Sequence, residues 1–400
     1  MASAAGAAVI SIPLTLYVHM PWCVRKCPYC DFNSHQLKSA RPDSAYVGAL
    51  LRDLERELQR APGRTIECVF FGGGTPSLFE PEDFAHFLAQ VRSLADVRRD
   101  AEITLEANPG TIERGRFAGY AQAGVNRVSL GAQSFDPRSL QRLGRIHSPE
   151  DTERAVAELQ AAGIHNFNLD MMYALPGQSV EESLHDMRHA CSLGPSHISF
   201  YQLTLEAGTV FYSRPPSLPD EETAWRMQTE GQEILAEAGF EQYEVSAYAR
   251  PGARCRHNLN YWLFGDYIGI GAGAHGKLSM SVPGRILRTV KPKQPGEYQV
   301  QAMRNPVSCG DVRSGIESLG ECHIVAARDL PFEFMLNALR LNEGFRQECF
   351  VERTGLSIDS VAAKIREVQQ RGLLEVHRGG WQPTALGRRF LNDLQAAFLP

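Results

Sequence analysis

The stretch LTLYVHMPWCVRKCPYC, residues 14–30, joins a short β-branched and aromatic run to a loop with three cysteines. Cys23, Cys27 and Cys30 form a C-x3-C-x2-C array. Structural zinc needs four closed ligands, and no second pair of Cys or His follows at the spacing of a half-site. A cubane iron–sulfur cluster can bind to three thiolates and leave its fourth iron open for another ligand. We therefore predict that these three cysteines hold a [4Fe-4S] cluster after the first strand.

Strand-like runs alternate with longer helical patterns as far as about residue 205, which is typical of repeated β-α units and a parallel sheet. The helical stretch 44–61, for example, places Tyr46, Leu50 and Leu54 on one face. Such a repeat fits a partial barrel or an open doubly wound sheet, and in both the functional residues gather at the carboxyl ends of the strands. The six expected strands are residues 14–19, 67–71, 102–107, 126–132, 166–172 and 196–203.

Composition and charge exclude several classes of protein. The 400 residues are 43% hydrophobic and 22% charged, which suits two or three packed units. A net charge of -5 gives no overall field that would attract nucleic acid or an anionic membrane. Residues 1–24 carry no Lys, Arg, Asp or Glu, but Pro13 and Pro21 interrupt them, so we expect no transmembrane segment. Nine cysteines without a disulfide framework favour a reducing compartment, and we expect a cytoplasmic protein.

Changes in sequence character divide the chain into three expected domains. Residues 1–215 form the β-α core, and residues 216–325 extend it after a proline-rich stretch. Residues 326–400 have the order helix, turn, helix, β wing and final helix, which is similar to a winged helix. Because residues 329–400 hold nine basic and nine acidic side chains, we expect no nucleic-acid partner and disfavour a DNA-binding regulator with an iron–sulfur sensor.

Glycines and polar residues close successive strands of the predicted core. The glycine run 72–74 follows the second strand and would let a ligand approach the backbone closely. Glu106, Gln133 and Asp170 come at the ends of the next three strands. Arg145 adds a cation that can pair with a ligand carboxylate. A purely structural sheet has no reason to repeat this pattern, so we expect these residues to face one binding site.

The cysteine array and the β-α repeat together resemble the radical S-adenosylmethionine (SAM) superfamily. The wider stretch LYVHMPWCVRKCPYCDFNSH, residues 16–35, is similar to the group that contains oxygen-independent coproporphyrinogen III dehydrogenase and haem chaperones. This resemblance covers nearly the whole chain and implies a partial (β/α)6 TIM-like barrel, a [4Fe-4S] cluster, and SAM bound at the open iron. It places the SAM-binding positions of the superfamily on Tyr17, Gly73, Gly74, Thr75, Glu106, Gln133, Arg145 and Asp170.

The segment RHNLNYW, residues 256–262, resembles the HNxxYW motif of the haem chaperones. It places His257 near the aromatic rings of Tyr261 and Trp262, and haem needs an axial nitrogen ligand and flat apolar walls. We therefore predict that His257 binds haem, with Cys255 as a rival ligand. A histidine near aromatic rings is, on the other hand, more often a packed core residue.

Two departures separate this chain from the dehydrogenase of the same group. The dehydrogenase carries a further cysteine at the position of Phe32, and it has an extension before its cluster loop, whereas this chain has 22 residues before Cys23. We therefore expect a haem chaperone that transfers haem to an acceptor protein. The alternative is an active oxygen-independent coproporphyrinogen III dehydrogenase or another radical SAM enzyme. No catalytic residue can be assigned from the sequence.

Overall fold

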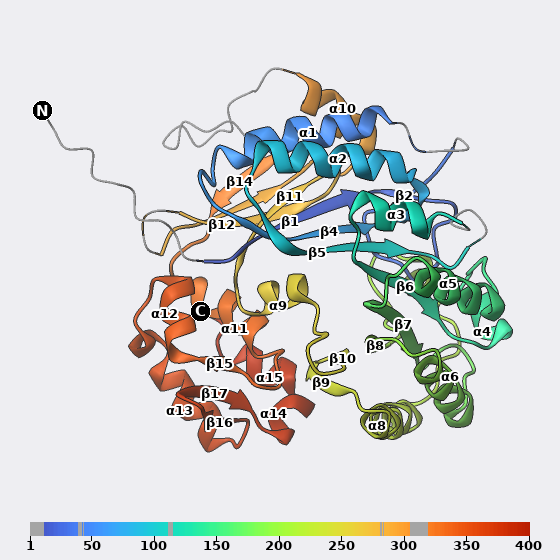
Figure 1. Cartoon of the computed structure of the whole chain (residues 1–400). Helices are drawn as coiled ribbons and strands as arrows, with labels where there is room; N and C mark the ends of the chain where they lie inside the picture. Colours follow the sequence, from blue (N-terminus) through green and yellow to red (C-terminus); the bar gives the residue numbers. More distant parts are fainter. Residues whose placement is uncertain are drawn as a thin grey trace, which may run out of the picture.

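The computed structural model (Figure 1) describes residues 12–38, 42, 44–110, 115–280, 282, 284–304 and 319–400. The first eleven residues of the expected core domain lie outside this description. Twelve strands of the described residues form one curved sheet. In spatial order they are β14 (Glu321–Ile324), β13 (Ile286–Val290), β12 (His275–Ser279), β11 (Asp266–Ile270), β1 (Leu14–Met20), β4 (Ile66–Gly73), β5 (Val97–Ala107), β6 (Arg127–Gln133), β7 (Phe167–Tyr173), β8 (His197–Gln202), β10 (Ala247–Ala249) and β9 (Glu241–Glu244).

The six strands expected from the sequence are β1, β4, β5, β6, β7 and β8, and they run parallel in this order. They are buried along most of their length because helices cover one face and further chain covers the other. The predicted α/β class with a partial (β/α)6 arrangement is therefore confirmed. The core strands bring their carboxyl ends to one edge, where the predicted site residues stand.

Helices follow the strands and lie around the outer face of the curved sheet (Figure 1). Three of them start with a capping box, in which Glu80 pairs with Asp83, Ser148 with Asp151 and Ser179 with Glu182. No helix of the described part of the chain is long and apolar enough to cross a membrane. The helices are α1 (Ala45–Leu58), the 3₁₀ turn η1 (Pro76–Leu78), α2 (Pro81–Leu94), α3 (Phe117–Ala123), α4 (Pro137–Arg142), α5 (Pro149–Ala161), α6 (Val180–Ser192), α7 (Val210–Ser213) and α8 (Glu221–Glu237).

The region 216–325 adds strands at both sides of the parallel core. β10 pairs antiparallel with β8, and β11 pairs parallel with β1 on the opposite side. The sequence analysis did not predict β11, because DYIGI is short and lies in a glycine-rich region. α10 (Pro295–Met303) packs beside α1, while α9 (Arg256–Trp262) lies on the face of the sheet opposite α1 and α2 (Figure 1). The predicted haem segment is thus held against the inner face of the core.

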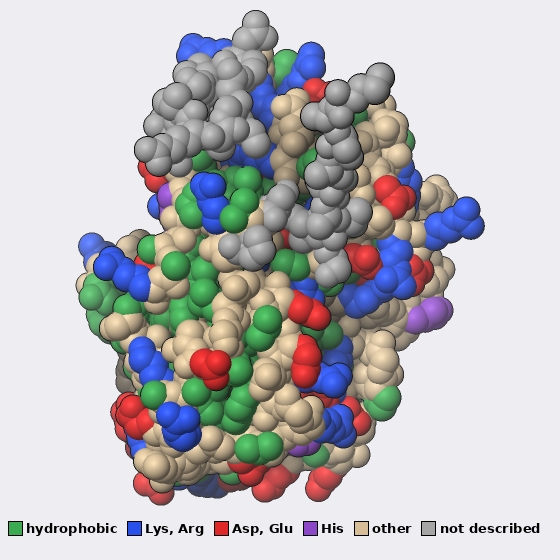
Figure 2. All heavy atoms as spheres, turned by 90° about the vertical axis from the view of Figure 1, so that its left-hand side faces the viewer, with side chains coloured by type: hydrophobic (Ala, Val, Ile, Leu, Met, Phe, Trp, Pro, Cys, Tyr) green, Lys and Arg blue, Asp and Glu red, His purple; other side chains and the backbone are tan. Residues whose placement is uncertain are grey.

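The C-terminal residues form a smaller unit with its own hydrophobic core, centred on Phe334, Phe345 and Phe350. Lys and Arg side chains are interspersed with Asp and Glu on the face that Figure 2 shows, in keeping with the balanced charge of this region. Two short strands of the cluster loop, β2 (Trp22–Cys23) and β3 (His35–Gln36), pair separately. The C-terminal elements are α11 (Leu330–Ala338), β15 (Phe345–Arg346), α12 (Gln347–Thr354), η2 (Ile358–Ser360), α13 (Ala362–Gln370), β16 (Leu374–His377), β17 (Gly380–Pro383), α14 (Ala385–Arg389) and α15 (Leu391–Ala396).

Candidate functional site

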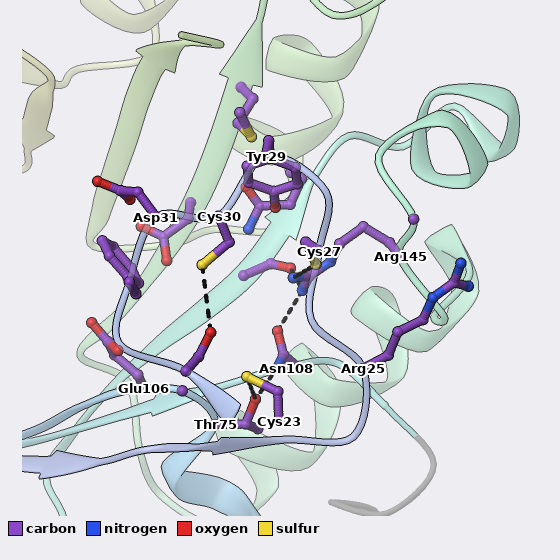
Figure 3. A pocket seen from close by; sticks show the side chains of 18 of the residues that line it. Cys23, Arg25, Cys27, Tyr29, Cys30, Asp31, Thr75, Glu106, Asn108 and Arg145 are labelled. Carbon is purple, nitrogen blue, oxygen red and sulfur yellow. Dashed lines mark hydrogen bonds between the residues drawn. The ribbon is translucent and has the colours of Figure 1, made fainter. Parts of the chain in front are cut away.

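A cavity of about 540 Å³ opens where the core strands end at their carboxyl termini. The loop with the three cysteines lies along one side of it, and residues from the ends of β4 to β8 form the rest (Figure 3). This is where a parallel sheet is expected to bind its ligands. Tyr17 and His257 lie outside the lining. The predicted SAM-binding residues that line the cavity are Gly73, Gly74, Thr75, Glu106, Gln133, Arg145 and Asp170.

Each of the three cysteine sulfur atoms has at least one side-chain hydrogen-bonding partner in the site (Figure 3). The pairs are Thr75 with Cys23 (3.5 Å), Arg145 with Cys27 (3.7 Å) and Ser34 with Cys30 (4.0 Å). Hydrogen bonds to the sulfur atoms are among the factors that set the reduction potential of an iron–sulfur cluster. The site therefore supplies partners as well as ligands.

The arrangement of the thiols fits a cluster better than a single metal ion. Among the residues that the structure describes, no three His, Cys, Asp or Glu side chains converge on one ion position. A cubane cluster places its thiolates on different iron atoms, so the ligands need not meet at a point. Burial raises the pKa of the Cys23 and Cys30 thiols, so they carry protons that a bound metal displaces.

The glycine run at the end of β4 makes room for the chain itself. A Cβ atom on Gly73 would lie 2.4 Å from the His19 ring, and one on Gly74 would lie 2.6 Å from the carbonyl oxygen of Trp22. Gly73 also has a φ of 112°, which residues with side chains rarely adopt. The sequence predicts that a ligand uses the space that these glycines leave. In the structure, residues before Cys23 fill the space beside Gly73 and Gly74 instead.

Two buried carboxyl groups, those of Glu106 and Asp170, face the cavity. Burial and the neighbouring Asp170 raise the pKa of Glu106 to about 7, while its Oε2 accepts the N–H of Gly73 at 3.0 Å. Burial also raises the pKa of Asp170, whose oxygens accept hydrogen bonds from Ser129 and Asn168. A cationic ligand group placed between the two carboxyl groups would favour their ionised forms.

Gln133 occupies a strained position at the end of β6. Its φ of 69° lies in the left-handed region, which costs a residue with a side chain about 1–3 kcal/mol. The strained backbone turns the side chain so that Oε1 accepts the hydroxyl of Tyr201 at 2.8 Å. Strain of this kind clusters at binding sites, so it supports a functional position for Gln133.

Arg145 contacts the cluster loop instead of standing free for a ligand carboxylate. Its guanidinium donates to Cys27 Sγ, to the Gly131 carbonyl at 2.7 Å and to Asn108 Oδ1. Asn108, which was not predicted from the sequence, lines the cavity two residues after Glu106. The Asn–Pro pair at the end of β5 was the available signal, because such pairs mark the point where a strand gives way to a turn.

Tyr17 connects the base of the cluster loop to the inner face of the sheet. His19 Nε2 donates to the carbonyl of Asn33 at 2.9 Å, so His19 Nδ1 accepts the hydroxyl of Tyr17 at 2.9 Å. The ring of Tyr17 is stacked with those of Phe70 and His257, at centroid distances of 6.2 and 6.1 Å. Tyr17 thus lies between the predicted cluster site and the predicted haem segment.

The HNxxYW segment forms α9, and its histidine is buried. His257 is 2% exposed and Cys255 is fully buried. Burial and the charge of Arg127 lower the pKa of His257 to about 3, so the imidazole is neutral. Its Nδ1 has no hydrogen-bonding partner. The structure therefore keeps a neutral imidazole with a free ring nitrogen away from solvent.

Glu102 of β5 anchors the start of α9. Its carboxylate accepts the backbone N–H of Arg256 at 3.1 Å and that of His257 at 3.3 Å, and the thiol of Cys255 lies 3.6 Å from it. At the other end of the helix, the buried Nε1 of Trp262 has no partner. A buried polar atom without a partner costs about 1–3 kcal/mol. Other contacts still hold this end of α9, because Asn260 donates to the carbonyl of Asp266 at 2.8 Å and the Arg340 guanidinium lies over the Trp262 ring.

The chain is similar to proteins that share this architecture. Residues 17–190 match the Radical SAM superfamily, and residues 325–390 match the HemN C-terminal domain. Over 387 residues the chain is 48% identical to the heme chaperone HemW of Escherichia coli (strain K12), covering 97% of this chain and 98% of that protein. It is 35% identical to the radical S-adenosyl methionine domain-containing protein 1, mitochondrial, of Bos taurus, covering 93% and 85%. The solved structure of coproporphyrinogen III oxidase (HemN) from Escherichia coli, described as a radical SAM enzyme, is 20% identical with a TM-score of 0.79, covering 100% of this chain and 93% of that one.

Proposed function

This chain belongs to the family of the heme chaperone HemW, within the radical SAM superfamily, and on that premise we propose that it binds haem and transfers it to an acceptor protein. One observation carries the proposal. The similarity to a protein named as a heme chaperone spans 97% of this chain, so it includes α9 and the C-terminal unit as well as the superfamily core. The chain therefore matches that protein in the regions that a shared radical SAM core alone would not explain.

The cavity is the proposed site of the cluster and of SAM. Cys23, Cys27 and Cys30 bind the [4Fe-4S] cluster, whose open iron, when bound, supplies a ligand position for the amino and carboxylate groups of SAM. The buried carboxyl groups of Glu106 and Asp170 attract the cationic parts of SAM. The other proposed SAM-binding residues are Tyr17, Gly73, Gly74, Thr75, Gln133 and Arg145.

His257 is the proposed axial ligand of haem. Its neutral imidazole and the free Nδ1 suit an iron atom, and the ring of Tyr261 lies against it at a centroid distance of 4.8 Å. Because the side chain is 2% exposed, haem reaches it only when α9 leaves the anchor at Glu102. Haem loading on this segment is thus coupled to an opening of the inner face of the core.

Anaerobic reconstitution of the cluster followed by titration with haem tests the proposal. We expect a Soret band that saturates at equimolar haem. In parallel, coproporphyrinogen III, SAM and a reductant should form no protoporphyrinogen above controls, since Phe32 occupies the position of the further cysteine. The absence of saturable haem binding, together with repeated turnover of coproporphyrinogen III, would overturn the chaperone assignment in favour of the enzyme.

The proposed place of work is the cytoplasm, and the proposed partner is a haem-accepting protein rather than a nucleic acid. Among the described residues, Cys68, Cys191, Cys255 and Cys349 form no disulfide, which suits a reducing compartment. We assign residues 1–215 and 216–325 to the core and its extension, and residues 326–400 to the C-terminal domain. The hydrophobic cluster around Phe334 lies mostly within residues 326–400 and supports the last boundary, whereas the cluster under the large sheet contains residues of both the core and its extension.

A further inference from the structure

A chain of hydrogen bonds connects two of the three cluster cysteines through residues that belong to three different strands or loops (Figure 3). Arg145 donates to Cys27 Sγ and also to Asn108 Oδ1. The amide nitrogen of Asn108 donates to Thr75 Oγ1 at 2.8 Å, and the Thr75 hydroxyl donates to Cys23 Sγ at 3.5 Å. Asn108 is the only member that touches neither sulfur, yet the two halves of the chain meet at its side chain.

The donor and the acceptor of each hydrogen bond in this series follow from the chemistry of Arg145. A guanidinium group donates hydrogen bonds and cannot accept them, so the Asn108 oxygen must face it and the amide NH₂ must face Thr75. Because Thr75 Oγ1 then accepts the hydrogen bond of the Asn108 amide, its own hydroxyl hydrogen is left to point at Cys23. Arg145 is itself held by the Gly131 carbonyl at 2.7 Å.

We propose that Asn108 is a positioning residue. It orients the Thr75 hydroxyl so that it donates a hydrogen bond to the Cys23 thiolate, and it thereby raises the reduction potential of the bound cluster. A donor to a thiolate stabilises the more negative, reduced state of the cluster. Asn108 acts on Cys23 through Thr75. It also accepts a hydrogen bond from the Arg145 guanidinium, which donates to Cys27. The inference rests on the assignment of the [4Fe-4S] cluster under the proposed function.

The isosteric change Asn108→Asp tests whether the Asn108 amide determines where the Thr75 hydroxyl donates its hydrogen bond. A carboxylate still accepts from Arg145 but cannot donate to Thr75, so the Thr75 hydroxyl turns toward residue 108 and leaves Cys23 without its donor. In a dithionite titration followed by the EPR signal of the reduced cluster, we expect a more negative midpoint. At the midpoint potential of the parent, the ratio of reduced to oxidised cluster should fall about three- to tenfold.

The added negative charge of Asn108→Asp also lowers the potential, and a double-mutant cycle with Thr75→Val separates the two causes. Thr75→Val removes the hydroxyl, so Asn108→Asp in that background should produce a clearly smaller shift than in the parent. Thr75→Ser keeps the hydroxyl and should keep the parent potential. If Asn108→Asp loses its cluster, the comparison of Thr75→Val with Thr75→Ser still measures the same donor. Equal potentials for those two variants would overturn the proposal.

Ser34→Ala is the comparison variant, because Ser34 pairs with Cys30 and also bonds to Cys23, but lies outside the chain of bonds through Asn108. Its shift should add to that of Asn108→Asp. Iron and sulfide are measured on every sample, so that a failure of the cluster assignment can be distinguished from a failure of the role proposed for Asn108. A parent that binds no cluster would overturn the cluster assignment and this inference with it. A parent with an intact cluster, in which the Asn108→Asp and Thr75→Val shifts simply add, would overturn this inference alone.

Discussion

The imidazole of His257 is stacked on the ring of Phe70, with the ring centroids 4.8 Å apart and the planes inclined by 20°. Phe70 belongs to β4 of the core, and its neighbour Tyr17 in β1 lies against the same imidazole. The residue that the motif marks for haem is therefore part of the packing of the core. The proposed ligation of haem by His257 would replace this ring contact with an iron–nitrogen bond.

We predict that His257→Ala weakens haem binding and shifts the Soret band, because it removes the axial nitrogen. The absorbance of the cluster and the affinity for SAM should stay unchanged, since His257 lies outside the cavity lining. Cys255→Ala is compared in parallel, because the sequence leaves Cys255 as a rival ligand. Titration of each variant with haem measures the effect.

The control for His257→Ala is His257→Phe, which keeps an aromatic ring against Phe70 but offers no nitrogen. It should bind haem as weakly as His257→Ala while unfolding at a temperature closer to that of the parent. If the His257 and Cys255 variants all bind haem with the affinity and spectrum of the parent, the HNxxYW segment is a structural element and haem binds elsewhere.

We predict that Glu102→Gln makes haem binding tighter and the protein less stable. The change weakens the anchor of α9, since a neutral amide accepts the N–H groups of Arg256 and His257 less strongly than a carboxylate does. Stability to urea should fall by about 1–3 kcal/mol. The apparent haem affinity should rise severalfold, because a larger fraction of the protein has α9 released. Glu67→Gln, which alters an exposed pair with Arg98, should change neither quantity.

We predict that replacing Cys23, Cys27 and Cys30 together by Ala leaves a folded but colourless protein. The three thiols are the proposed ligands of the cluster, and the core of the sheet does not depend on them. Iron and sulfide analysis after anaerobic reconstitution measures the loss, with Cys349→Ala as a control outside the cavity. Retention of about four iron and four sulfide per chain in the triple variant would contradict the assignment.

We predict that SAM binds more tightly as the pH rises through about 7, the pKa of Glu106. Below that pH the free protein keeps a proton on Glu106, and a cationic ligand group must displace it. Asp170 raises this pKa, whereas the Gly73 N–H and the Arg127 guanidinium lower it. Calorimetric titrations with SAM between about pH 6 and pH 8 should therefore show an affinity that increases up to tenfold and proton release on binding.

Glu106→Gln isolates this carboxyl group from the titration of SAM itself. The variant should bind SAM more weakly at pH 8 and should lose the part of the pH dependence that Glu106 causes. Asp170→Asn is compared because Asp170 also carries a carboxyl group with a raised pKa. A parent and a Glu106→Gln variant with the same pH profile would show that Glu106 does not titrate on binding.

Local patterns in the sequence were sufficient for the core strands and for the cysteine loop. The period of β-branched and aromatic runs depends only on neighbouring residues, so β1, β4, β6, β7 and β8 were predicted to within about two residues at each end. β5 begins at Val97, five residues before its predicted start at 102. The C-x3-C-x2-C spacing likewise places three thiols on one loop whatever surrounds it. The common location of the polar residues at the strand ends could also be predicted, because the carboxyl ends of parallel strands lie at the same edge of a sheet.

Only the tertiary structure decided which residues meet across the sheet. Asn108 and Arg145 are 37 positions apart and connect two of the proposed cysteine ligands only because β5 and β6 are neighbours. His257 belongs to a motif that the sequence marks clearly, but its burial against Phe70 depends on the face of the sheet that α9 covers. From the sequence alone, the glycine run at 72–74 is as consistent with a ligand-binding turn as with close packing of the chain. The close approach of His19 and Trp22 in the structure shows the packing role. Contacts of this kind depend on strand order and sheet curvature, which arise from the packing of the whole chain and leave no local pattern.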